Sequence, residues 1–75
     1  MDRDAIVAKL AEIRTSALSQ GYAELAGFFA GVEDLPSPKV GGKVISALTW
    51  LEGKPAYNSF GTQLSMVAMN LKNLK

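Results

Sequence analysis

The chain has no cysteine and no histidine among its 75 residues. Without cysteine it can form no disulfide, no thiolate nucleophile and no cysteine-ligated zinc or iron–sulfur site. Without histidine it lacks the commonest general base and the commonest ligand of transition metals. A serine–lysine pair such as Ser46 with Lys43 would need a deeply buried lysine, which so short a chain can hardly provide. We therefore expect no metal, no cofactor and no enzymatic activity.

A net excess of charge of either sign is lacking, because the formal net charge is only +1. It is also unevenly distributed: residues 1–35 hold six acids and three bases, a net of −3, and residues 36–75 hold one acid and five bases, a net of +4. Halves of opposite sign attract one another between two copies packed head to tail. A chain below about 80 residues without a disulfide or metal often gains stability by oligomerisation. Both observations predict a homodimer.

Long apolar runs are missing as well. The apolar stretch without charge at residues 25–32 has eight residues, whereas a membrane-spanning helix needs about 20. The first four residues, Met1–Asp4, carry two acids and do not resemble the basic start of a secretory signal. We expect no membrane association and a cytoplasmic location.

Helical periodicity is what the sequence does contain. Four segments repeat apolar residues at helical spacing, and glycine or proline separates them. The sequence predicts an all-α fold with a single domain over residues 1–75, built as a small antiparallel bundle of four helices, three long and one short. The expected helices span about 3–19, 22–31, 38–52 and 59–74.

The expected core consists of one apolar stripe on each long helix. The stripe residues are Ile6, Leu10, Ile13 and Ala17 in the first; Val40, Val44, Ala47, Leu48 and Leu51 in the third; Phe60, Leu64, Val67, Leu71 and Leu74 in the fourth. The expected helix starts are capped by Asp2 or Asp4, by Ser37 before Pro38, and by Asn58 or Ser59. Glycine is expected to end the first helix at Gly21.

Apolar residues outside these stripes predict a binding surface. Met66 and Met69 lie about 120–180° around the fourth helix from its core stripe, and Thr62 and Asn73 share their face. Trp50 lies beside the stripe of the third helix. Methionine adapts its shape and tryptophan supplies a large contact area, so both suit protein interfaces. We expect these five residues to bind a protein partner.

Two further sites are considered. Lys39, Gly41, Gly42 and Lys43 follow an expected helix start, where backbone N–H groups can bind an anion, although the pattern is not a phosphate-binding P-loop. The third and fourth helices could also form a loose helix-turn-helix that contacts DNA or RNA. The residues expected at such a nucleic-acid surface are Lys54, Ser59, Thr62 and Gln63.

The predicted function follows from what remains after catalysis is excluded. We expect a small helical interaction protein, namely a regulator, adaptor or inhibitor that binds a larger protein, as a homodimer. The alternative is a small helix-turn-helix-like regulator that binds nucleic acid. Scarce net charge and the lack of arginine after residue 14 weigh against the alternative, since arginine is the preferred reader of guanine.

Overall fold

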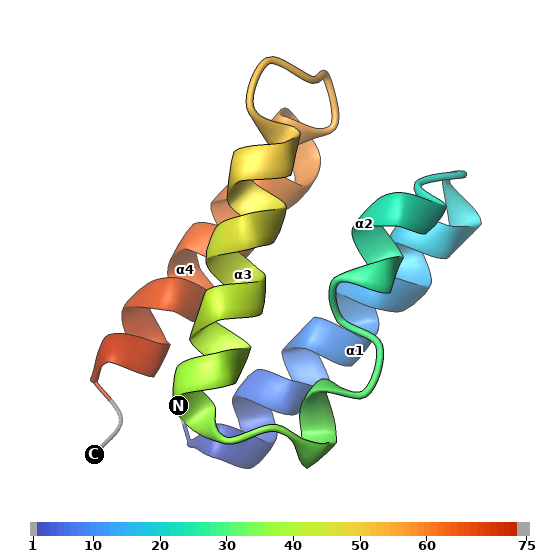
Figure 1. Ribbon diagram of the computed structural model, residues 1–75. Coiled ribbons are helices and arrows are strands. Elements are labelled where there is room, and N and C mark those ends of the chain that lie inside the picture. The colour runs from blue at the N-terminus through green and yellow to red at the C-terminus, as the bar shows by residue number, and fades with distance from the viewer. Residues whose placement is uncertain (1, 74–75) are drawn as a thin grey trace.

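The computed structural model describes residues 2–73, and all regular structure within that range is helical. The elements are α1 (Arg3–Ser19), α2 (Ala23–Gly27), a short 3-10 turn (Val32–Asp34), α3 (Ser37–Leu51), a π-turn (Tyr57–Gly61) and α4 (Thr62–Lys72). Figure 1 shows α1 and α2 as one pair, and α3 and α4 as a second pair joined by a loop at one end. The all-α prediction with four helices is confirmed, and the antiparallel arrangement stays a prediction.

Helix α1 has the bounds expected from its capping residues. The side chain of Asp2 accepts a hydrogen bond from the backbone N–H of Ala5 at 2.8 Å, which satisfies one of the free donors of the first turn. Gly21 follows the last turn with a φ of 86°, a left-handed conformation that only glycine adopts without strain. The helix therefore begins and ends where the sequence indicated.

Helix α2 is shorter than expected. The apolar spacing predicted a helix over residues 22–31, but α2 ends at Gly27 and the chain continues in turns to a 3-10 turn that begins at Val32. Glycine is about 1 kcal/mol less favourable than alanine inside a helix. Gly31 has a φ of 74°, which is incompatible with a continuing helix.

Helix α3 begins one residue earlier than expected. Pro36 is the capping residue and has an extended conformation, so the prediction that Ser37 caps this helix is wrong. The N–H groups of Lys39 and Val40 both donate to the Pro36 carbonyl, at 2.9 and 3.1 Å. Proline at the second helical position has no N–H that would need a partner.

Helix α4 is preceded by a wide π-turn, and neither Asn58 nor Ser59 caps it. The last residue of this turn, Gly61, needs to be a glycine, because a Cβ at this position would lie only 2.9 Å from Cδ1 of the Tyr57 side chain. The bare backbone lets the tyrosine ring lie against the turn. Leu74, which was expected at the end of the core stripe, lies outside the described residues.

One apolar cluster forms the core. Its buried members are Ile6, Leu10, Ile13, Ala17, Leu25, Ala26, Phe29, Val32, Val40, Val44, Ala47, Leu51, Ala56, Phe60, Leu64 and Val67. Leu48 and Leu71 pack against this cluster while partly exposed. None of the helices described for residues 2–73 is long and apolar enough to span a bilayer.

Candidate protein-interaction site

The outer face of α4, defined by Thr62, Met66, Met69 and Asn73, points away from the core. All four residues are exposed, with exposed fractions of 59% for Met66 and 66% for Met69. Their positions are separated by four, three and four residues, the spacing with which a helix presents one seam to another helix. The expected exposure of both methionines is confirmed, and their role in binding stays a prediction.

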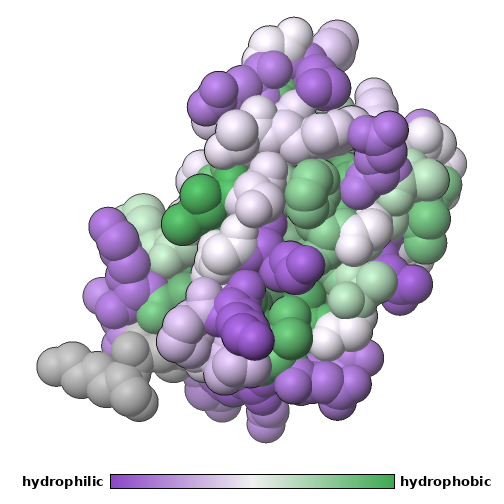
Figure 2. Space-filling model, viewed as in Figure 1, coloured by the Kyte–Doolittle hydropathy of each residue, from purple (hydrophilic) through white to green (hydrophobic). Residues whose placement is uncertain are grey.

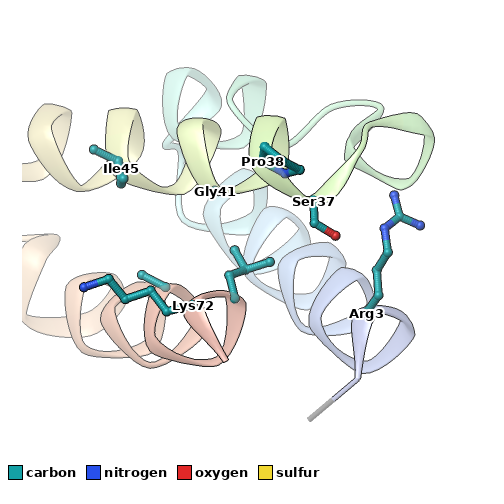
Figure 3. Close-up of a pocket in the computed structure, with 8 residues that line it drawn as sticks. Arg3, Ser37, Pro38, Gly41, Ile45 and Lys72 are labelled. Atoms are coloured by element: carbon teal, nitrogen blue, oxygen red, sulfur yellow. The ribbon is translucent and has the colours of Figure 1, made fainter. Parts of the chain in front are cut away.

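A groove between α3 and α4 lies beside this face. It has a volume of about 570 Å³ and is drawn in Figure 3. Its lining residues are Arg3, Ser37, Pro38, Gly41, Ile45, Ala68, Leu71 and Lys72. Two of the lining residues, Gly41 on α3 and Ala68 on α4, carry little or no side chain, and a Cβ at Gly41 would meet no heavy atom within 4 Å. We call it the α3–α4 groove.

Ile45 makes the groove wall unusually apolar, since 62% of this residue is exposed. Figure 2 shows apolar side chains reaching the surface of this view between hydrophilic ones. The groove was not predicted from the sequence. The signal that could have found it is the pair Gly41 and Ile45, which lie one helical turn apart on a flank of α3 that its core stripe does not use.

Among residues 2–73, two cations and no acid contribute to the groove lining. The Arg3 guanidinium donates to the backbone carbonyl of Glu33 at 3.3 Å and to that of Leu35. It therefore ties the first turn of α1 to the segment that precedes α3. Lys72 lines the groove from the α4 side. It lies in the last turn of this helix, where its charge complements the negative end of the helix dipole.

Trp50 lies on the other flank of α3. Its indole Nε1–H donates to the Glu24 carboxylate at 2.8 Å, and its ring meets that of Phe28 edge-on at 6.4 Å. The ammonium of Lys54 lies 4.5 Å from the centre of the indole. Trp50 is thus half-buried and joins α3 to α2. The structure does not place it on the surface that contains Met66 and Met69.

The expected anion site has no backbone cradle. Gly41 and Gly42 lie within α3, where backbone N–H groups donate to carbonyls four residues earlier. The N–H groups of Lys39 and Val40, in the first turn, both donate to the Pro36 carbonyl. Lys39 and Lys43 are exposed side chains at the surface. No observation favours anion binding by these four residues, which stays a prediction.

The residues of the nucleic-acid alternative are largely engaged within the chain. The Lys54 ammonium donates to the Trp50 carbonyl at 2.6 Å. The Gln63 amide donates to the Ser59 carbonyl at 3.0 Å, and Ser59 itself lies in the π-turn. Thr62 is exposed on the outer face of α4. No observation favours this alternative, which stays a prediction.

Neither a metal site nor a known relative adds to this description. Among residues 2–73, no group of three or more histidine, cysteine, aspartate or glutamate side chains is placed to hold a metal ion. Comparison of the chain with protein-family models, with curated protein sequences and with solved structures finds no match.

Proposed function

We propose that this protein is a small non-enzymatic interaction protein that binds a larger protein through the outer face of α4 and acts as a homodimer. The observation that carries the proposal is the exposure of Met66 and Met69 on the face of α4 opposite to the core. The core shelters one side of α4, through Leu64 and Val67. The opposite side is apolar at its centre and polar at its ends, as in a protein interface.

The size of the outer face limits what it can do alone. A specific interface buries about 800 Å² on each partner, which is about 17% of the 4622 Å² of accessible surface of this chain. Helix α4 has 11 residues and is therefore about 16 Å long. A partner that forms a stable complex must therefore cover both this helix and the surface beside it. Methionine suits such a contact because its unbranched side chain adapts to the partner.

The proposal is tested by photocrosslinking in extract of the cells that produce the protein. A photoreactive phenylalanine analogue is introduced at position 66 and, as the control, at position 18. Leu18 is a matched site because it is 52% exposed but lies on α1. We expect an adduct with a larger protein from position 66, and excess unlabelled wild-type protein should compete it away.

The competition step shows whether the methionines themselves bind. Excess unlabelled Met66→Ala/Met69→Ala protein should fail to compete, because it retains the fold and lacks the contact atoms. The proposal would be wrong if positions 66 and 18 gave the same adducts. It would also be wrong if neither gave an adduct, or if the double variant competed as well as the wild type.

A further inference from the structure

The two helices that form the α3–α4 groove carry positive charge only. Helix α3 contains two lysines and α4 contains one, and neither contains an aspartate or a glutamate. Glu52 directly follows α3, but the 15 residues of this helix place it about 22 Å from the end at which Arg3 is bound. The groove itself is lined by Arg3 and Lys72 and has an apolar centre that includes Ile45 and Leu71. A ligand of this groove therefore meets cations and apolar atoms.

Both cations of the groove can bind a carboxylate. The one ion pair within residues 2–73 joins Lys9 to Glu12 on α1, so no acid of this part of the chain pairs with Arg3 or Lys72. Arg3 uses only its Nη2 atom for the hydrogen bonds to two backbone carbonyls. A guanidinium has five N–H donors, so those on Nε and Nη1 remain. Figure 3 shows the side chains of Arg3 and Lys72 at opposite ends of the groove.

A second copy of the chain does not supply the matching charge through any helix described for residues 2–73. Helix α1 has three bases and two acids, and α3 and α4 have lysines and no acid. Helix α2 has one acid but only five residues. Two grooves that faced each other would also bring Arg3 and Lys72 of both copies together, and like charges repel. The charge therefore favours a different molecule in the groove.

We propose that the α3–α4 groove binds an acidic amphipathic helix of the larger partner, with apolar side chains in the centre of the groove and carboxylates beside Arg3 and Lys72. The inference rests on the proposed function, because it states what that partner presents. A partner that covers the outer face of α4 reaches the groove as well, since Met69 on that face is about 60° around the helix from Lys72. Amphipathic helices bind grooves in this way through apolar residues one turn apart.

An anionic membrane would match the charge of this surface too, but the shape of the surface favours a helix. Binding to a membrane surface needs apolar side chains that project from among the cations. Two of the residues that line the groove, Gly41 and Ala68, carry little or no side chain. The centre of the groove is therefore hollow, and a flat bilayer cannot fill it. A bound helix can, because its residues one turn apart project from the same face.

Selection from a random peptide library tests this occupant without knowledge of the partner. Phage that display peptides of about 16 residues, enough for four helical turns, are selected on the wild-type protein and counter-selected on Gly41→Leu. A Cβ at Gly41 would meet no heavy atom within 4 Å, and leucine is the better helix former, so this variant fills the groove and keeps the fold. We expect the enriched peptides to carry apolar residues three or four positions apart, flanked by aspartate or glutamate.

Fluorescence anisotropy with synthetic copies of the enriched peptides measures the affinities. Gly41→Leu should bind at least about tenfold more weakly than the wild type. Gly42→Leu should bind like the wild type, because residue 42 is exposed on α3 and does not line the groove. Lys72→Gln should weaken binding about two- to fivefold, and Lys9→Gln, the same change of charge on α1, should not. Raising the salt concentration from about 0.1 M to about 1 M should weaken wild-type binding, because salt screens the charges.

The inference is overturned if no peptide is enriched, if the enriched peptides are neutral or basic, or if Gly41→Leu binds them as tightly as the wild type. It is also overturned if another occupant shows the same dependence on Gly41. That occupant would be a second copy if sedimentation equilibrium found a dimer of the wild type and not of Gly41→Leu. It would be a membrane if vesicles of phosphatidylcholine and phosphatidylserine in equal parts bound the wild type and not the variant.

The crosslinking experiment at position 66 is read separately, because it reports an adduct with a larger protein. Acidic peptides that depend on Gly41, without such an adduct, would refute the proposed function and leave the groove as an acidic-helix site. An adduct at position 66 without acidic peptides would refute the inference about the groove alone.

Discussion

Replacing Gly42 with alanine is expected to raise the free energy of unfolding by about 1 kcal/mol, the penalty of glycine relative to alanine inside a helix. The residue is exposed within α3, and the new Cβ would meet no heavy atom within 4 Å. The added methyl group is therefore neither buried nor in a clash, and only the helix propensity of residue 42 changes the free energy of unfolding. With an unfolding entropy of about 2.1 cal/mol/K per residue, or about 160 cal/mol/K for this chain, the expected rise in Tm is about 6 °C.

Thermal and urea unfolding followed by far-UV circular dichroism measure this effect. Wild type and variant are compared at one low protein concentration, because dimerisation makes Tm depend on concentration. Gly53→Ala is the control of opposite sign. Gly53 has a φ of 76°, and a residue with a Cβ pays about 1–2 kcal/mol in this conformation. An unchanged or lowered Tm for Gly42→Ala would refute the assignment of Gly42 to an unobstructed helix interior.

Two further predictions concern contacts that hold helix ends and neighbouring helices. Trp50→Phe should lower the free energy of unfolding by about 1 kcal/mol through loss of the hydrogen bond to Glu24, and Trp50→Ala by about 3 kcal/mol through loss of the half-buried ring as well. Urea unfolding separates them, and an alanine variant as stable as wild type would contradict the contact between α2 and α3. Asp2→Ala should cost about 1 kcal/mol because the N–H of Ala5 loses its acceptor. Asp2→Asn keeps an acceptor and should unfold at nearly the wild-type temperature, so equal losses from both substitutions would contradict the cap.

Much of the core could be predicted from spacing alone. The stripe expected on α1, Ile6, Leu10, Ile13 and Ala17, is the set of residues that this helix buries. This works because α1 is long, has a side-chain cap and ends at a glycine with a positive φ. Local chemistry and tertiary packing agree there, so periodicity is sufficient.

The errors occur where backbone conformation overrides periodicity. Phe28 and Phe29 continue the apolar spacing of α2, but the helix ends at Gly27 and Gly31 has a φ of 74°, so the chain follows turns instead of a further helical turn. The π-turn before α4 brings the Tyr57 ring so close to Gly61 that a Cβ there would clash with it, a local backbone geometry that the spacing of apolar residues does not encode. Asn58 and Ser59 were expected to cap α4 only because asparagine and serine are preferred at capping positions.

In the candidate site, too, some features could be predicted from the helix period and others could not. Exposure of Met66 and Met69 follows from the helix period, because a face opposite to the core stripe of a terminal helix has no neighbour to cover it. The position of Trp50 does not follow from the helix period, since its partners Glu24, on α2, and Phe28, directly after α2, lie more than 20 residues away in sequence. The groove likewise required knowing which flanks of α3 and α4 face each other.

The core described for residues 2–73 contains no polar or charged side chain. Hydrogen bonds and ion pairs are directional and would fix one rotation and one translation of each helix against the next. Within the core itself, only the shapes of aliphatic and aromatic side chains distinguish the native alignment from its neighbours, and the directional contacts of Trp50 with Glu24 and of Arg3 with Leu35 lie outside it. Interior substitutions that conserve volume should therefore be tolerated together, and those that change shape should permit helices to slide or rotate before the chain unfolds.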